Sequence, residues 1–141
     1  MIKFSVNGKP APQGSKTRNR AGAVYESSKA VAPWREAIRA ETQRACEVPL
    51  AGPVSVLIGF RMTRPKSHYR TGRNAHLLKG GAPGYPDGKP DLDKLARAVL
   101  DGLKEGGAFW DDAQVVTLAV AKAYADASGP GADIEVTEVN R

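Results

Sequence analysis

Hydrophobic residues change their spacing several times along this chain, and the order of these changes limits the folds it can adopt. Some segments alternate apolar and polar residues and carry β-branched side chains, which predicts strands; these segments are residues 2–7, 23–25, 54–62, 115–124 and 134–139. Two others repeat apolar residues at steps of three and four, which predicts helices over residues 28–46 and 91–104. The remaining segments are rich in glycine, proline and polar residues and are expected to be loops.

The order strand, strand, helix, strand, helix, strand, strand indicates an α+β fold with some α/β character. We expect a single mixed sheet of about four to five strands, with the two main helices packed on it. The chain has 141 residues, which suits one domain with one hydrophobic core, and no internal repeat or linker divides it. Residues 1–141 are therefore predicted to form a single domain.

Bulk composition excludes several classes of protein. Hydrophobic residues make up 41% of the chain and charged residues 26%, as in ordinary globular proteins. No apolar run reaches the roughly 18 residues of a membrane span, and the first residues have the pattern of a strand rather than of a signal peptide. Because Cys46 is the single cysteine, an intramolecular disulfide and a cysteine zinc cluster are excluded. We expect a cytoplasmic protein without a membrane partner.

The positive charge is distributed unevenly. The formal net charge is +6, but residues 1–25 and 61–86 contain 11 of the 21 basic residues and no acidic one. Residues 63–90 are expected to form one long loop, which in a small domain is usually functional. Basic loops without acids suggest arms that grip a polyanion, although solvated loops that happen to be basic are the alternative. The candidate polyanion contacts are Lys16, Arg18, Arg20, Arg64, Lys66, Arg70, Arg73, Lys94 and Lys122.

Two pairs of aspartates interrupt this basic chain within 22 residues. Asp91 and Asp93 lie in Lys-Pro-Asp-Leu-Asp, and Asp111-Asp112 follows Trp110. Inside a helix, side chains two residues apart point in nearly opposite directions, because each residue turns by about 100°. Asp91 and Asp93 can therefore converge only if Asp91 is extended or caps the helix while Asp93 lies in its first turn. Asp111-Asp112 can return to either end of that helix, and the sequence leaves both possibilities open.

A carboxylate cluster in a positive field is what a metal-dependent enzyme acting on nucleic acid needs. Basic side chains attract the phosphate backbone, and three or four converging acids can hold one or two Mg²⁺ ions. A nearby cation such as Arg97 or Lys94 can stabilise the charge that develops on the phosphate. The alternative is structural, because aspartate is common at helix starts and in turns.

The acidic region also carries a family resemblance. Lys-Pro-Asp-Leu-Asp-Lys-Leu-Ala-Arg-Ala-Val-Leu-Asp-Gly-Leu at 89–103, then Trp-Asp-Asp-Ala-Gln-Val-Val at 110–116 and Lys122, resembles the RusA family of Holliday junction resolvases. Val-Asn-Gly-Lys-Pro-Ala-Pro-Gln-Gly-Ser-Lys at 6–16 is similar to the opening of the phage branch of that family. The resemblance implies a homodimer, dependent on Mg²⁺ or Mn²⁺, that makes paired nicks across a four-way DNA junction in recombination and repair. It also implies a phage or prophage origin and action in the bacterial cytoplasm or at the nucleoid.

The resemblance assigns roles to individual positions. Asp91 and Asp93 match the first two catalytic acids of the family, Asp112 matches the third, and Asp111 matches its acidic neighbour. All four are predicted metal ligands. Arg97 stands where the family has an essential lysine, and it keeps the charge but cannot readily give up a proton. If the lysine acts through its charge, Arg97 can replace it; if it transfers a proton, Lys94 or Lys122 must do so.

Three alternative functions remain open. The first is a junction-binding protein that has lost catalysis, with Arg97 as the cause. The second is a nuclease for other branched DNA, such as flaps. The third is a phosphohydrolase that does not act on nucleic acid, which fits the acids but not the basic loops.

Phe109 and Trp110, before the second acid pair, could wedge into the centre of a junction, but packing beneath the site is the interpretation we favour.

Overall fold

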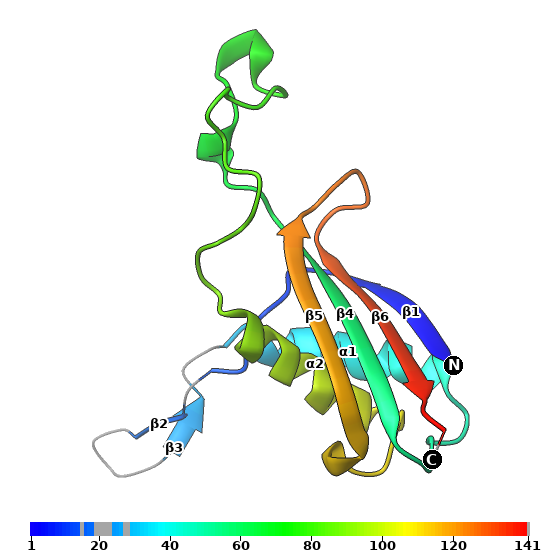
Figure 1. The fold of residues 1–141 in the computed structure, drawn as a ribbon. Helices are drawn as coiled ribbons and strands as arrows, with labels where there is room; N and C mark the ends of the chain where they lie inside the picture. The colour runs from blue at the N-terminus through cyan, green and yellow to red at the C-terminus, as the bar shows by residue number, and fades with distance from the viewer. Residues whose placement is uncertain (15, 19–23, 27–28, 141) are drawn as a thin grey trace.

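Four strands form the central sheet of the computed structural model, and two helices cover one of its faces (Figure 1). The strands of this sheet are β1 (Ile2–Asn7), β4 (Val54–Met62), β5 (Val115–Tyr124) and β6 (Gly131–Glu138), and the helices are α1 (Val31–Ala45) and α2 (Leu92–Glu105). A separate two-stranded sheet pairs β2 (Lys16–Arg18) with β3 (Val24–Glu26), and short 3-10 helices are η1 (Lys66–His68), η2 (Gly72–Asn74) and η3 (Asp112–Gln114). The structure describes residues 1–14, 16–18, 24–26 and 29–140, and it gives side chains for 1–14 and 29–140.

The central sheet is mixed and has the strand order β1-β6-β4-β5. Strand β6 runs antiparallel to both β1 and β4, whereas β4 and β5 are parallel. Two parallel strands cannot be joined by a tight turn, and the connection between β4 and β5 contains α2. The predicted α+β fold, one mixed sheet with two helices packed on it, is confirmed.

The core lies between the sheet and the helices. Val56, Ile58 and Phe60 alternate along β4 with more exposed residues, and each is at most 3% exposed. Leu95 and Leu103 of α2 are fully buried. The period of two in the strand and the apolar stripe of the helix therefore face each other, as the sequence pattern predicts.

The two helices approach each other closely where two glycines face α1. A β-carbon added at Gly102 would lie 2.7 Å from the β-carbon of Ile38, and one added at Gly106 would lie 2.5 Å from that of Thr42. Both distances are shorter than any that real β-carbons make, so a side chain at either position would push the helices apart. These contacts fix the position of α2 on the core.

Both helices lie close to the predicted positions. The helix expected over residues 28–46 spans Val31–Ala45, and the one expected over 91–104 spans Leu92–Glu105. After α2, Gly107 has a φ of 91°, a conformation that favours glycine and ends the helix. Within the described ranges, neither helix has the length and apolar character that crossing a membrane requires.

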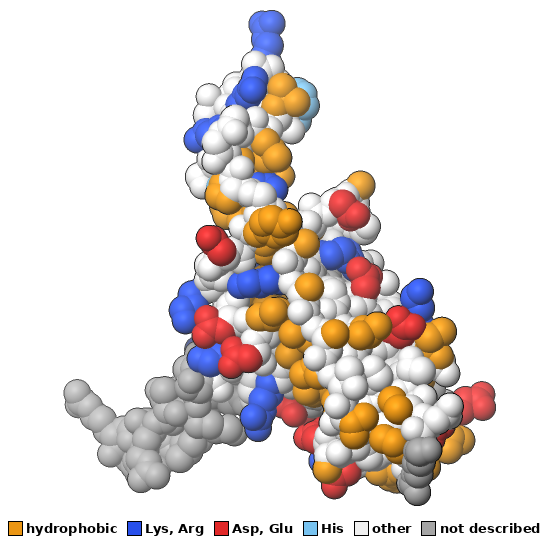
Figure 2. All heavy atoms as spheres, in the orientation of Figure 1, with side chains coloured by type: hydrophobic (Ala, Val, Ile, Leu, Met, Phe, Trp, Pro, Cys, Tyr) orange, Lys and Arg blue, Asp and Glu red, His pale blue; other side chains and the backbone are white. Residues whose placement is uncertain are grey.

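A long loop, residues 63–90, projects from the body between β4 and α2 and is called the arm below (Figure 1). Backbone hydrogen bonds join its two limbs: Arg70 N donates to Leu77 O at 2.8 Å, and Lys79 N donates to His68 O at 2.9 Å. Figure 2 shows Lys and Arg side chains spread along its outer part. The predicted long basic loop is therefore present as a paired projection.

Candidate functional site

Helix α2 begins at the first acid pair. Asp91 occupies its N-cap position with an extended backbone, φ −68° and ψ 138°, and Asp93 lies in the first turn. This is the arrangement that the sequence requires if the two carboxylates are to converge. The Asp91 side chain makes no capping hydrogen bond to the helix and instead accepts one from the Lys89 ammonium at 3.0 Å. The capping alternative therefore does not apply to Asp91.

Lysines surround Asp91. The hydrogen bond from Lys89 lowers the pKa of the Asp91 carboxyl, and the charges of Lys89, Lys94 and Lys122 lower it further. The Lys89 side chain is 85% exposed, so this counter-ion is free to leave when another cation arrives. A carboxylate that stays ionised beside an exchangeable partner is suited to hold a divalent cation, which prefers oxygen ligands.

Lys122 reaches the same segment from the sheet. It lies opposite Phe60 in the register of β5 and β4, and the two therefore share the sheet face that meets the helices. The Lys122 ammonium donates to the carbonyl oxygens of Gly88, at 2.7 Å, and of Pro90, at 2.8 Å. The sequence left open whether Lys122 faces solvent or the site; the structure directs it to the residues that precede Asp91.

The second acid pair lies in a tightly bonded turn before β5. The Asp111 carboxylate accepts a hydrogen bond from Ala113 N at 2.9 Å and caps η3. The side-chain oxygen of Gln114 accepts from the backbone N–H groups of Trp110 and Asp111 at 2.8 and 2.9 Å. Its side-chain nitrogen donates to two carbonyls of the connection that precedes β4, each at 2.8 Å. The capping alternative is thus correct for Asp111, whereas Asp112 is exposed.

Asp112 lies beside the later part of α2. Burial raises the pKa of Asp101, the charge of Asp112 raises it further, and the charge of Arg97 lowers it. Asp101 is about 15 Å along the helix axis from Asp91, because each residue rises about 1.5 Å. The acids thus lie at two places along α2: Asp91 and Asp93 are at its start, and the charge of Asp112 acts on Asp101 in its later part.

No three acids meet in the part of the chain that the structure describes. Across the described ranges, no cluster of three or more histidine, cysteine, aspartate or glutamate residues could hold a metal ion. Asp101, which lies two turns after Asp93 and one after Arg97, was not among the predicted site residues. That four-residue spacing on one helix face was the available signal.

The sequence of this chain matches a known family. Residues 7–137 match the family described as Endodeoxyribonuclease RusA. The chain belongs to the RusA endodeoxyribonuclease family. It is a Holliday junction endodeoxyribonuclease, a nuclease of recombination and repair, and nucleases of this family depend on a metal ion. The resemblance seen in the sequence is confirmed, and no curated protein matches the chain.

The basic residues of this RusA-family nuclease have two different settings. The Arg64 guanidinium stacks 4.0 Å from the ring centre of Tyr124 and donates to Pro83 O at 2.6 Å, and Arg70 donates to Leu78 O at 3.2 Å. Both arginines therefore help to hold the arm together. Three other predicted contacts are exposed, and no described residue bonds to their side chains: Lys66, Arg73 and Lys94.

Three predicted DNA contacts precede α1. The side chains of Lys16 and Arg18 lie outside the described residues, although their backbone forms β2. Arg20 lies entirely outside the described residues. Their predicted contacts with DNA stay predictions.

The aromatic pair before the second acids divides between core and surface. Phe109 is 1% exposed and packs in the core, as expected. Trp110 is 68% exposed, so the expectation that it packs beneath the site is wrong. The bonded turn at Gln114 fixes the Trp110 backbone, and the nuclease therefore holds an indole in solvent beside Asp111. An aromatic ring so presented is a surface on which an unstacked base can lie.

Proposed function

We propose that this nuclease cuts four-way DNA junctions by paired nicks, with Mg²⁺ held by Asp91, Asp93 and Asp112. The state of Asp91 carries the proposal: it is extended, does not cap α2, and is kept ionised by lysines at the start of the helix that holds Asp93. Asp111 uses one carboxylate oxygen as a cap and keeps the other for the ion or the substrate.

The donor chemistry fits a hard divalent cation. Mg²⁺ usually takes one or two carboxylates together with waters and substrate phosphate, and Mn²⁺ accepts the same oxygen ligands. When bound, such an ion supplies positive charge to the phosphate and activates water. Asp91 and Asp93 orient it from a helix start whose backbone is fixed by the packing of α2.

Arg97 supplies the permanent positive charge of the site. It is exposed on α2 one turn after Asp93, and its charge is felt at Asp101. A guanidinium remains protonated, so its contribution is to stabilise negative charge on the phosphate rather than to transfer a proton. Replacement of the family lysine by Arg97 is therefore compatible with an electrostatic role.

We also propose that two copies act together. A four-way junction has approximate two-fold symmetry, and two active sites are needed for paired nicks. Because the described protomer assembles no group of three acids, the third acid joins Asp91 and Asp93 through a movement or from a second copy.

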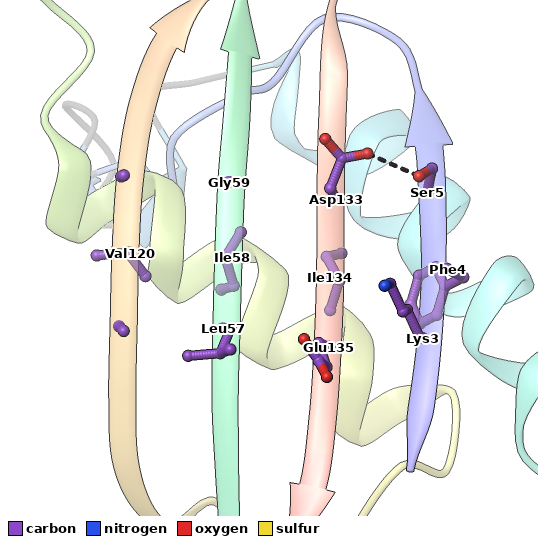
Figure 3. Close-up of a pocket in the computed structure, with 12 residues that line it drawn as sticks. Lys3, Phe4, Ser5, Leu57, Ile58, Gly59, Val120, Asp133, Ile134 and Glu135 are labelled. Carbon is purple, nitrogen blue, oxygen red and sulfur yellow. Dashed lines mark hydrogen bonds between the residues drawn. The ribbon is translucent and has the colours of Figure 1, made fainter.

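The open face of the sheet supports this dimer. It carries a shallow, mainly apolar groove of about 460 Å³ over Gly59, whose lining includes Leu57 and Ala121 as well as the charged residues Lys3 and Glu135 (Figure 3). A β-carbon at Gly59 would touch nothing within 4 Å, so the groove is open. Lys3 and Glu135 lie opposite each other on β1 and β6, so they place both signs of charge on this face. An apolar face of this kind can pack against the same face of a second copy across a two-fold axis.

DNA contacts are proposed on the outer arm and beside both acid pairs. Lys66, Arg73 and Lys94 present exposed cations that can bind phosphates at the cost of no internal bond. Trp110 presents its indole for a base that is unstacked where the strands exchange. Recognition of this kind reads the shape of the junction and its phosphates.

Cleavage of a labelled four-way junction tests the proposal. Wild-type protein should produce paired nicks with Mg²⁺ or Mn²⁺ and none without a divalent ion. Asp93→Asn should bind the junction and not cut it, whereas Glu47→Gln, a carboxylate-to-amide change at an exposed position in the connection after α1, should cut normally. Binding without cutting by the wild type, followed by cutting after Arg97→Lys, would identify a binding protein that lost catalysis at that residue. Preference for flaps over four-way junctions would identify a nuclease for other branched DNA.

The dimer has a separate test. Sedimentation equilibrium should give a two-chain mass for the wild type and a smaller mass for Leu57→Glu, because a charge would enter the apolar groove. A dimer that survives Leu57→Glu would exclude the open face as the interface without excluding the nuclease.

A further inference from the structure

The backbone before the first catalytic acid is held from the sheet by one side chain. We propose that Lys122 is a positioning residue, which fixes residues 88–90 and thereby sets where Asp91 presents its carboxylate. The inference rests on the proposed function, in which Asp91 holds the metal. It gives Lys122 a role inside the protein instead of a contact with DNA.

The Lys122 ammonium clamps the backbone of residues 88–90. It donates to Gly88 O at 2.7 Å and to Pro90 O at 2.8 Å, so the two hydrogen bonds bracket Lys89. Asp91 follows Pro90 directly. A shift of the 88–90 backbone therefore moves the Asp91 α-carbon. On its downstream side Asp91 is held by α2, where Leu95 N donates to Asp91 O at 3.1 Å.

Few other bonds hold this segment. Pro90 has no N–H group, and among the described residues the N–H groups of Gly88 and Lys89 donate to no backbone or side-chain acceptor. The ion pair between Lys89 and Asp91 is local and moves with the segment. Within the described part of the chain, Lys122 is thus the one side chain of the sheet that hydrogen-bonds to residues 88–90.

The position of Lys122 on β5 explains why a lysine is needed. Its neighbours on the same face of the strand, Val120 and Tyr124, lie over the core side of the sheet, where a charge without partners is unfavourable. Two carbonyl acceptors satisfy the ammonium, and its four-carbon stem spans the distance from the strand to the loop. The protons that bind the two carbonyls are not available to a DNA phosphate.

The same end of β5 also holds the other limb of the arm. Tyr124, two residues after Lys122, lies under the Arg64 guanidinium and against the edge of the His68 ring, whose centre is 5.6 Å away. One limb is therefore anchored at Tyr124 and the other at Lys122. The segment that carries Asp91 is fixed to the body at the point where the arm leaves it.

NMR relaxation of the backbone tests the clamp directly. Lys122→Met keeps the length of the side chain and removes its donors, and Lys122→Arg retains donors for two carbonyls. Lys104→Met, the control, removes an exposed lysine in the last turn of α2. The order parameters of the Gly88, Lys89 and Asp91 amides should fall in Lys122→Met from about 0.85 towards 0.6 or below. They should be unchanged in Lys104→Met and largely restored in Lys122→Arg.

Two functional readouts separate positioning from DNA binding. Without divalent ions, the affinity of Lys122→Met for a four-way junction should equal that of the wild type. The Mg²⁺ concentration for half-maximal cleavage should rise roughly 10- to 100-fold, as when a residue that orients a metal ligand is removed. Lys122→Arg should return that concentration close to the wild-type value.

Other results would overturn the proposed role of Lys122. Weaker junction binding by Lys122→Met with unchanged order parameters would make Lys122 a DNA contact and overturn the proposal. If Lys122→Met fails to fold, Lys122→Gln is measured in the same way, and unchanged order parameters there would also overturn it. If the wild type cuts no branched DNA, the proposed function fails, while the order parameters still decide whether Lys122 fixes residues 88–90.

Discussion

The two acid pairs of this nuclease are built from the same residue type but have opposite surroundings. Asp91 lies among lysines, is kept ionised, and leaves its helix uncapped. Asp111 caps η3, and Asp112 lies near Asp101, whose pKa is raised. A carboxylate is thus ready for a cation when neighbouring bonds hold its backbone and leave its oxygens exchangeable. By that measure the first pair is prepared and the second is partly committed to structure.

The first prediction concerns cleavage after one acid of the first pair, Asp91, is neutralised. Asp91→Asn should lower single-turnover cleavage of a four-way junction by on the order of 10³-fold, because an amide cannot replace an ionised ligand. Asp111→Asn, which keeps a capping oxygen, should lower it far less. Equal losses in the two variants would show that both pairs contribute in the same way.

The second prediction tests the exposed indole beside the committed pair. Trp110→Ala should weaken junction binding by about 1–3 kcal/mol, the usual contribution of one stacked base. The tryptophan fluorescence of the wild type should be quenched when the junction binds. The quenching can be assigned to Trp110, because Trp34 is 4% exposed and its emission should stay constant. If Trp110→Ala binds the junction with wild-type affinity, and the junction leaves the fluorescence of the wild type unchanged, Trp110 is not part of the DNA interface.

The third prediction concerns the structural duty of Asp111. Asp111→Ala should lower the free energy of unfolding by about 1 kcal/mol, because the cap of η3 is lost. Asp111→Ser retains a capping oxygen and should keep most of that stability in urea denaturation. Asp91→Ala, which removes no cap, should not reproduce the loss.

The smallest effect is a pH dependence at Asp101. Its folded pKa is raised above the ordinary value of 3.8, chiefly by burial and then by Asp112, so the fold disfavours its charged form. The resulting destabilisation is absent below pH 3.8, develops as pH rises to the folded pKa, and is complete above it. Asp101→Asn should therefore melt at a higher temperature than the wild type at pH 7, with a difference that disappears in acid. A difference independent of pH would contradict this assignment.

Strand periodicity predicted most of the fold. The strands expected over residues 2–7, 54–62 and 115–124 have those bounds, because alternation is strong where one face is buried. The last strand begins earlier than expected, at Gly131, because Gly-Ala-Asp is a poor strand sequence that two neighbouring strands complete. Strand β2 is short and polar and has no hydrophobic pattern to reveal it.

The site was predictable only where the information is local. The extended Asp91 before a helical Asp93 is the arrangement that their two-residue spacing requires if the carboxylates are to converge. The direction of Lys122 depends on the register of β5 and on the path of the arm, and the stacking of Arg64 on Tyr124 joins residues far apart in the chain. Such contacts are set by the assembled fold, so no local pattern predicts them.

The close contact of the helices has a consequence for how this protein can vary. Gly102 and Gly106 leave no room for one more methyl group against α1. Helix α2 also carries Asp93, Arg97 and Asp101, so a mutation at either glycine would displace several acting side chains without changing one of them. A substitution in the outer arm displaces none of these side chains. A substitution in the outer arm would therefore change contacts with DNA, whereas a side chain at Gly102 or Gly106 would move the helix that carries the acids and the arginine.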